Sequence, residues 1–469
     1  MDLQAKPEIY DLVILGSGAG SKLLAWTFAG QKQRVAVVER RYVGGACPNI
    51  ACLPSKNVVH TAQIAHDVRR SEEFGIHIDG FHISMPAVID RKRRMVQGLV
   101  ETHLALFKRS GAELIMASGR FVGPKTIEAT LSDGTKRLLQ GKNVVIGVGT
   151  HAAVDNIPGL AEAKPLTHIE ALELDRVPDH LMILGAGYVG LEFAQAMRRL
   201  GSRVTLIDRN HRVIHAEDED ITEGLQDLLQ EEGIELVLNA RIKSVSGLSG
   251  RSVHVVLEQN GVELSLDGTD ILVASGRVPN TKDIGLELAG VELTDKGYIK
   301  VNERLETTAP GVWAVGEVAG SPHFTHISED DFRVVHANIL GGNRVTTGRQ
   351  VPFCLFTDPE FARVGLSEKE ARSKGITYRL LKVPMTSVLR ARSLMETRGF
   401  LKCLIERDGD RILGFAALGV GAGEMMGATQ IAMIAGLPYT ALRDAILTHP
   451  TFVEGLSSLF SSEPSAPKE

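Results

Sequence analysis

The chain has few cysteines, few aromatic residues and no excess of basic charge. Its four cysteines in 469 residues cannot form the disulfide framework of a small secreted protein. The formal net charge of -5 argues against nucleic acid as a partner, because such binding needs basic patches that neutralise phosphates. The N-terminus lacks an apolar signal region and the chain lacks a long apolar run, so we expect a cytoplasmic protein with no membrane partner.

Glycine and chain length are the features in excess. A chain of 469 residues is too long for one hydrophobic core, so about three domains are expected. The 48 glycines indicate turns that approach phosphates closely. One basic run, at 91–94, lies in a stretch with helical apolar spacing, which favours a solvated helix face.

Two segments repeat the order strand, glycine turn, helix, strand and acid. The key residues of the first copy are Gly16, Gly18, Gly20 and Glu39. Those of the second copy are Gly185, Gly187, Gly190 and Asp208. Free N–H groups at a helix N-terminus bind a pyrophosphate, and the acid accepts hydrogen bonds from a ribose hydroxyl. Two such units predict two dinucleotide sites, although the first copy has Ser21 where a last glycine is usual. The alternative is a pair of purely structural turns.

Two cysteines follow the first unit in the stretch 44–56, GGACPNIACLPSK. In a regular helix, Cys47 and Cys52 would lie beyond the ~7 Å Cα separation that a disulfide allows. Pro48 and Pro54 disfavour a regular helix before residue 53, so the segment can fold back and close a disulfide. A helix that starts near Cys52 would lower the pKa of its thiol. The alternatives are two buried thiols or half of a metal site. No second cysteine pair completes a zinc site, so no metal is predicted.

The motif GGxCxNxxCxPSK resembles the active-site signature of the class I pyridine nucleotide–disulfide oxidoreductases, which include glutathione reductase, dihydrolipoamide dehydrogenase and mercuric reductase. The resemblance extends from Tyr10 to about Phe460. It implies an α/β fold with two Rossmann-like domains, for FAD and NAD(P), and a C-terminal α+β dimerisation domain. The expected boundaries are 1–150 for the FAD domain, 151–275 for the NAD(P) domain, 276–345 for a return segment that completes the FAD domain, 346–460 for the dimerisation domain and 461–469 for a disordered tail.

Further motifs follow in the family's order. The stretch 308–317, TAPGVWAVGE, looks like the second FAD motif, with Gly316 followed by Glu317 where aspartate is usual. The glutamate is one methylene longer, so its hydrogen bond must be re-aimed. Gly276 opens the return segment GRVPN. The resemblance implies further cofactor contacts from Gly45, Gly119, Gly149, Thr150, Phe324, Thr325 and His326. His323 and His326 also have metal-like spacing, but no third ligand is evident.

The resemblance gives each catalytic residue a role. NAD(P)H lies on one face of the flavin under Tyr188, and Lys56, paired with Glu192, lies near flavin N5. Reduced flavin passes electrons to the Cys47–Cys52 disulfide, where Cys52 forms the charge-transfer thiolate and Cys47 attacks the substrate. His449, oriented by Glu454, is the acid–base group, and it comes from the other subunit of a homodimer.

The choice of nicotinamide cofactor is less defined by the sequence. Asp208 favours NADH, because an acid at this strand end accepts hydrogen bonds from free ribose hydroxyls. Arg209 follows directly and could bind the 2′-phosphate of NADPH. We weigh these residues slightly toward NADPH.

We therefore expect an FAD-dependent NAD(P)H oxidoreductase that acts on a disulfide or a similar sulfur oxidant through Cys47 and Cys52. One alternative is reduction of mercuric or another soft metal ion, since several stretches look like mercuric reductase and related bacterial reductases of reactive chlorine or hypothiocyanous stress. However, no cysteine follows Cys403, and His449 stands where mercuric reductases have tyrosine. The other alternative is a non-catalytic flavoprotein redox sensor, against which the His449–Glu454 pair argues.

Overall fold

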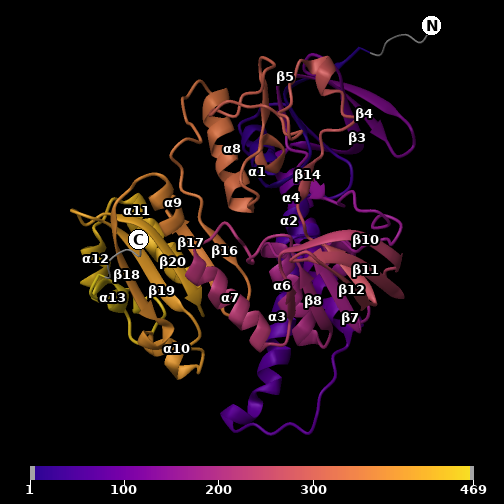
Figure 1. Ribbon diagram of the computed structural model, residues 1–469. Helices are drawn as coiled ribbons and strands as arrows, with labels where there is room; N and C mark the ends of the chain where they lie inside the picture. The colour runs from indigo at the N-terminus through magenta and orange to yellow at the C-terminus, as the bar shows by residue number, and fades with distance from the viewer. Residues whose placement is uncertain (1–5, 465–469) are drawn as a thin grey trace.

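The computed structural model describes residues 6–464, and residues 465–469 of the predicted disordered tail lie outside the described residues. Figure 1 shows three sheet-containing regions. The C-terminal region (yellow) stands to one side, while the indigo N-terminal segment and the orange segment around α8 lie together at the top. Segments distant in sequence therefore build one region.

The first sheet has six strands and is mainly parallel. Its strands are β1 (Glu8–Leu15), β2 (Val35–Glu39), β3 (Glu113–Gly123), β4 (Thr126–Leu131), β5 (Lys136–Ile146) and β15 (Val312–Ala314). β3, β2, β1, β5 and β15 pair in parallel in that order, and β4 pairs antiparallel with β3 and β5. Every residue of β2 is buried, as expected for a parallel strand covered on both faces. Helices α1 (Ala19–Gly30) and α8 (Thr325–Ile339) pack against each other beside this sheet (Figure 1).

The second sheet has four parallel strands in the order β13-β7-β8-β9. Its strands are β7 (His180–Leu184), β8 (Arg203–Ile207), β9 (Glu235–Val237) and β13 (Asp270–Val273). The helices that belong to it are α6 (Tyr188–Leu200) and α7 (Glu219–Glu231). A separate antiparallel sheet lies beside it, formed by β10 (Ala240–Leu248), β11 (Ser252–Gln259) and β12 (Val262–Gly268).

The third sheet is antiparallel, in the order β16-β17-β20-β19-β18. Its strands are β16 (Phe353–Leu355), β17 (Glu360–Gly365), β18 (Tyr378–Pro384), β19 (Phe400–Glu406) and β20 (Ile412–Gly419). The helices of this region are α9 (Glu368–Ser373), α10 (Leu389–Ser393), α11 (Ala422–Ile434), α12 (Tyr439–Arg443) and α13 (Gly455–Phe460). The expected fold class, two parallel α/β units followed by an α+β domain, is confirmed.

The chain leaves and re-enters the first region through one two-stranded link. β6 (Thr150–Ala152) pairs antiparallel with β14 (Arg277–Pro279). After this link, β15 joins the first sheet beside β5. The remaining helices are α2 (Ala46–Asn49), α3 (Cys52–Arg69), α4 (Met85–Ser110), α5 (His168–Ala171) and the 3₁₀ turns η1 (Ser71–Phe74), η2 (Leu286–Ala289), η3 (Gly316–Ala319) and η4 (Met385–Ser387). The domain boundaries near 150, 275, 345 and 460 stay predictions. Within residues 6–464, no helix combines the length and apolar character needed to cross a membrane.

A buried lysine joins the second and third regions. Lys402 on β19 is fully buried, and its Nζ lies 2.7 Å from Asp218, 2.7 Å from Asp220 and 3.2 Å from Glu368. Oxygen atoms of these three carboxylates lie within 4.8 Å of one another, a spacing that could hold a metal ion. The Lys402 ammonium already supplies the positive charge at their centre. The cluster is therefore an ionic link between α7, α9 and β19.

Replacement of Lys402 tests this link. Lys402→Met would leave three carboxylates close together without the buried ammonium at their centre, so we expect a loss of about 3–5 kcal/mol in the free energy of unfolding. Urea unfolding followed by circular dichroism measures the loss. Lys382→Met is the matched control, because Lys382 contacts Asp220 from a partly exposed position and should change stability by less than about 1 kcal/mol. Equal effects of the two variants would contradict the assignment.

Candidate active site

The first glycine turn connects β1 to the N-terminus of α1. Gly16 has φ of +93°, and a Cβ there would lie 2.5 Å from the carbonyl oxygen of Gly147. Gly18 is the N-cap of α1, and no side chain caps its amides. The buried Glu39 carboxylate accepts hydrogen bonds from the backbone N (2.9 Å) and Oγ (2.8 Å) of Ser17. Uncapped helix amides beside a strand-end acid fit the pyrophosphate and ribose of a dinucleotide.

The departure at Ser21 has a structural compensation. Ser21 is 1% exposed, where a last glycine would leave room for close helix–strand packing. A Cβ on Gly147 would lie 2.0 Å from Ser21 Oγ, so glycine at 147 supplies the space that serine at 21 occupies. The turn therefore keeps its close packing with the glycine moved to the facing segment.

The loop that carries the cysteines lies directly on this turn. Gly44 and Gly45 have φ of +92° and +82°. A Cβ on Gly45 would lie 2.6 Å from the Cα of Gly18, so only glycine permits this approach. Cys47 lies in the one-turn helix α2, and Cys52 is the first residue of α3.

The prolines were expected to disfavour a regular helix before residue 53, and the structure has one helical turn there, α2. Pro48 lies within α2, which is tolerated because residues in a first helical turn have no intrahelical partner for their N–H groups. The break occurs after α2 instead, at Ala51, with φ of -131° and ψ of -105°. The predicted helix start at Cys52 is present. The chain thus folds back between the two cysteines, as the two prolines allow.

The two active-site thiols are reduced and interact with each other. Cys47 donates a hydrogen bond to Cys52, whose Sγ also lies 3.4 Å from Thr325 Oγ1. The hydrogen bond from Cys47 lowers the pKa of Cys52 to about 6, with help from Thr325 and the positive charge of Lys56, against the opposing effect of burial. The same contact and burial raise the pKa of Cys47. In the reduced pair, Cys52 is therefore the thiolate and Cys47 the thiol.

The other two cysteines, Cys354 and Cys403, lie in strands and have raised pKa values. Cys354 lies half-buried in β16 and Cys403 is fully buried in β19. Burial raises the pKa of both thiols, and Glu360 adds to the rise at Cys354. Both stay protonated near neutral pH, consistent with the core positions that their apolar neighbours predict.

Lys56 and Glu192 form the predicted pair between α3 and α6. Lys56 Nζ lies 2.7 Å and 2.9 Å from the two carboxylate oxygens of Glu192. The backbone N of Phe356 donates to the same carboxylate at 3.0 Å, and the Lys56 ammonium lies 4.6 Å from the Phe356 ring centroid. Glu192 is buried, so this ion pair ties the helix that begins at Cys52 to the second glycine helix.

The second glycine turn repeats the geometry of the first. Gly185 has φ of +109°, and a Cβ on Gly190 would lie 1.9 Å from the carbonyl oxygen of Gly185. Gly187 is the N-cap of α6, again with no side-chain cap. The Asp208 carboxylate accepts from the backbone N of Ala186 at 2.7 Å, so the strand-end acid lies against the turn. These features fit a second dinucleotide.

Tyr188, the first residue of α6, belongs to a cluster of packed aromatic rings. The Tyr188 ring packs edge-on against Phe324 and Phe353, with centroid distances of 6.4 Å and 5.5 Å. Phe324 stacks on Phe353 and on His326. His326 Nε2 donates to the Pro352 carbonyl oxygen at 2.7 Å. The structure thus brings Tyr188, Phe324 and His326 together, and burial raises the pKa of Tyr188.

Glu317 uses its longer side chain to reach the link between the regions. Its Oε2 accepts a hydrogen bond from Thr150 Oγ1 and lies 3.1 Å from Arg277 Nε. Arg277 also donates to Thr150 Oγ1 at 2.6 Å. Sequence reasoning missed Arg277, although it directly follows Gly276 in the return motif. The three side chains join β6, β14 and η3 beside Gly149, which has φ of +64°, and Gly316, which has φ of +71°.

Gly119 has a packing reason of its own. A Cβ at this position of β3 would lie 2.5 Å from Leu15 Cδ1 and 3.0 Å from Val38 Cγ1. Glycine is therefore required by the first sheet, and the predicted cofactor contact of Gly119 stays a prediction.

His449 and Glu454 are paired in the third region. His449 Nδ1 lies 3.0 Å and 3.1 Å from the two carboxylate oxygens of Glu454. The His449 side chain is 62% exposed. Figure 1 shows α13, which begins directly after Glu454, well apart from α2, which holds Cys47. Within one chain, the predicted acid–base pair is formed but is distant from the cysteines.

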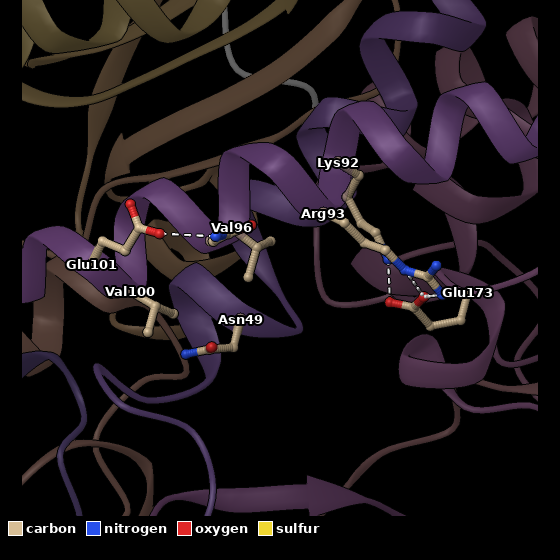
Figure 2. A pocket seen from close by; sticks show the side chains of 8 residues that line it. Asn49, Lys92, Arg93, Val96, Val100, Glu101 and Glu173 are labelled. Atoms are coloured by element: carbon tan, nitrogen blue, oxygen red, sulfur yellow. Dashed lines mark hydrogen bonds and ion pairs between the residues drawn. The ribbon is translucent and has the colours of Figure 1, made fainter. Parts of the chain in front are cut away.

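A pocket of about 260 Å³ lies between α2 and α4. Figure 2 shows Val96 and Val100 of α4 facing Asn49, which follows Pro48 in the loop that carries the cysteines.

Lys92 is buried and donates to the Leu172 carbonyl oxygen at 2.8 Å and to Glu173. The expectation of a solvated basic face at 91–94 was therefore wrong for Lys92, because a partner from a distant segment compensates its charge.

Comparisons with known proteins agree with this geometry. A family model described as pyridine nucleotide-disulphide oxidoreductase matches residues 10–331. A second model, described as the dimerisation domain of the same family, matches residues 351–459.

Individual relatives cover nearly the whole chain. The probable pyridine nucleotide-disulfide oxidoreductase RclA of Escherichia coli (strain K12) is 34% identical over 458 residues, which cover 96% of this chain and 99% of the relative. Mercuric reductase of Bacillus cereus is 32% identical over 449 residues, covering 95% of this chain and 70% of that protein. A solved structure, the Cu(II) complex of the HOCl-induced flavoprotein disulfide reductase RclA from Escherichia coli, superposes with a TM-score of 0.87 at 32% identity and covers 97% of this chain and 99% of its own.

Removal of Cys47 tests the electrostatics of the pair. In Cys47→Ala the thiol that stabilises the Cys52 thiolate is absent, so the pKa of Cys52 should rise from about 6 toward the ordinary thiol value. In the parent, Cys52 is a thiolate at any pH above its lowered pKa of about 6, and so at pH 7. In the variant the pKa is higher, so Cys52 should be mostly protonated at pH 7. Ultraviolet thiolate absorbance of the reduced protein against pH measures the shift. Thr325→Val is the control, with a smaller rise expected, and an unchanged Cys52 titration in Cys47→Ala would contradict the pairing.

Proposed function

Because this chain belongs to the pyridine nucleotide-disulphide oxidoreductase family, we propose that Cys47 and Cys52 are its redox-active pair and that Cys47 reduces a disulfide or a similar sulfur electrophile. The chain is an FAD-dependent NAD(P)H oxidoreductase with a C-terminal dimerisation domain. The observation that carries the proposal is the hydrogen-bonded thiol pair in which Cys52 ionises first.

The residues of this chain fit both cofactors. We assign the FAD pyrophosphate to the uncapped N-terminus of α1, its adenosine ribose to Glu39, and its ribityl chain to the region of Glu317 and Thr150. NAD(P)H is assigned to the N-terminus of α6, with Tyr188 moving aside for the nicotinamide. Bound FAD supplies the two-electron link that carries reducing equivalents from the nicotinamide to the Cys47–Cys52 disulfide.

The sulfur chemistry then follows thiol–disulfide exchange. His449 takes the proton of the Cys47 thiol, and the resulting thiolate attacks one sulfur of the substrate disulfide, breaks its S–S bond and forms a mixed disulfide. The released half leaves as a thiolate and takes that proton from His449. The Cys52 thiolate next attacks the Cys47 sulfur, reforms the Cys47–Cys52 disulfide and releases the second half as a thiolate, which takes a proton from solvent. Two electrons leave the dithiol and two substrate thiols form.

His449 acts, in this proposal, on the cysteines of the partner subunit. Glu454 fixes the imidazole by its hydrogen bond to Nδ1 and leaves Nε2 to exchange the proton. Exposed apolar side chains in the same domain support pairing, since Ile431 and Ile434 of α11 are 66% and 65% exposed and Ile446 is fully exposed. A second copy that covers these side chains would bring its own His449 to the cysteines of this chain, where the site of one chain is incomplete.

The geometry around Asp208 shifts our weighing of the nicotinamide cofactor toward NADH. The Asp208 carboxylate is held at the strand end by Ala186 N and by Asn210, so its negative charge would face a 2′-phosphate. Arg212, a second arginine that follows Asp208 closely in sequence, is already paired with Glu219. Both features disfavour NADPH, against the slight preference for it from the sequence.

Reduction of a soft metal ion is the second candidate. Thiolates bind soft metals, and the paired Cys47 and Cys52 present two sulfurs at one position. The Cu(II) complex of RclA and the similarity to mercuric reductase make copper and mercury the ions to test.

We also propose that the enzyme works in the cytoplasm, because its reductant NAD(P)H is held there.

Steady-state kinetics separate the two candidates. We expect oxidation of NADH, faster than of NADPH, with a panel of low-molecular-weight disulfides and sulfur oxidants, and little turnover with Cu²⁺ or Hg²⁺. Cys47→Ser should abolish disulfide turnover by at least about 10³-fold, because the attacking sulfur is gone, while direct electron transfer from the flavin to ferricyanide persists. Turnover of metal ions that survives His449→Ala, with no activity on any disulfide, would instead establish metal reduction.

Mixed dimers test the shared site. Neither Cys47→Ser nor His449→Ala should turn over a disulfide alone, but a heterodimer of the two variants contains one site with both an intact Cys47 and an intact His449. Co-expression with two affinity tags isolates this heterodimer, and about half of the parent activity per dimer is expected. A heterodimer of Cys47→Ser with the double variant is the control and should be inactive. An inactive mixed dimer would show that His449 serves the cysteines of its own chain.

A further inference from the structure

A lysine and a histidine from two helices lie beside the active-site loop. Lys22 is in the first turn of α1, and His103 is in the last part of α4. Lys22 Nζ lies 3.1 Å from His103 Nε2, so the ammonium donates to the neutral imidazole. Burial and the neighbouring Lys22 charge lower the pKa of His103, which keeps it neutral and able to accept. Trp26 packs against His103 with a centroid distance of 5.8 Å and supports the pair from one side.

The pair is in contact with the loop that carries Cys47. A Cβ on Gly44 would lie 2.3 Å from His103 Nδ1 and 3.2 Å from Pro48 Cγ, so the imidazole packs on the Gly44 backbone beside Pro48. Gly45 lies against Gly18, and the backbone N of Lys22 donates to the Gly18 carbonyl oxygen at 2.9 Å. Helix α1, the loop and α4 therefore fix the position of Lys22 relative to Cys47.

Side chains from three helices change the pKa of Cys47. Cys52, from α3, raises the pKa of Cys47 together with burial, while Thr325 from α8 and Lys22 from α1 lower it. Lys56 lowers the pKa of Cys52. Lys22 in turn faces Glu329 of α8 as well as Cys47, and its own burial lowers its pKa.

We propose that Lys22, held in place by His103, is the counter-ion of the Cys47 thiolate and keeps the attacking sulfur reactive within one subunit. This inference rests on the proposed function, in which Cys47 is the sulfur that attacks the substrate. No part of the mechanism above uses Lys22 or His103.

The ionisation of Cys47 needs a cation of its own. The first proton to leave the reduced pair gives the Cys52 thiolate, so a second negative charge on Cys47 must form beside an existing one in a half-buried site. A lysine ammonium lowers the free energy of that second charge. Because its hydrogen-bond partner His103 is neutral, the positive charge of Lys22 is not cancelled by that contact. Serial ionisation of two neighbouring thiols therefore uses two lysines, Lys56 for Cys52 and Lys22 for Cys47.

The test is the pH dependence of Cys47 alkylation in the FAD-loaded, full-length, reduced enzyme. Iodoacetamide modification of Cys47 is followed by peptide mass spectrometry, which needs no substrate. In Lys22→Met the midpoint of the rate–pH profile should move to higher pH, and the rate near pH 7 should fall about tenfold, while the plateau rate at high pH stays unchanged. Lys22→Arg should keep the parent profile within about twofold, because it retains the charge.

Controls separate the charge from folding and access. Lys108→Met removes an exposed lysine of α4, the helix that carries His103, and should leave the profile unchanged. His103→Leu should slow alkylation near pH 7 by less than Lys22→Met, since the charge stays but its anchor is lost. An unmoved midpoint in Lys22→Met, or a plateau rate that falls with it, would overturn the proposal. The proposed function fails separately, if Cys47→Ser retains disulfide turnover.

Discussion

The contact between the Gly45 and Gly18 backbones is the constraint on which the site depends. The active-site loop must lie on the first dinucleotide turn, and a single methyl group on Gly45 would collide with the Cα of Gly18. This approach places Cys47 beside the N-terminus of α1 and lets α3 begin at Cys52. The same turn that fits the pyrophosphate therefore also sets the position of the sulfur pair.

Ion pairs between helices hold the other parts of the site in register. Lys56 and Glu192 connect the helix that begins at Cys52 to the helix to which we assign the nicotinamide nucleotide. Lys402 connects the second region to the C-terminal domain in a similar way. A buried pair contributes less to stability than to geometry, because desolvation offsets much of the attraction. Each pair instead disfavours arrangements that would separate its charges.

Local patterns could be predicted from the sequence, and contacts between distant segments could not. The two glycine turns, the helix start at Cys52 and the His449–Glu454 pair follow from short motifs. The buried state of Lys92 depends on Glu173, and the placement of Lys22 depends on His103, 81 residues away. Likewise, the space for Ser21 comes from Gly147. Such pairs leave no periodic signal, since each member looks like an ordinary surface or packing residue within its own segment.

Because Cys354 and Cys403 stay protonated, oxidation of cysteine in this chain is directed to Cys47 and Cys52. A thiol is oxidised through its thiolate, and burial suppresses that form at both positions. Peroxide or hypohalous acid therefore meets a nucleophilic sulfur at the Cys47–Cys52 pair, where the first oxidation product can condense with the neighbouring thiol before irreversible sulfinic acid forms. Each such oxidation would end as the disulfide that the proposed catalytic cycle reduces, so the enzyme could reverse its own oxidation with one NAD(P)H.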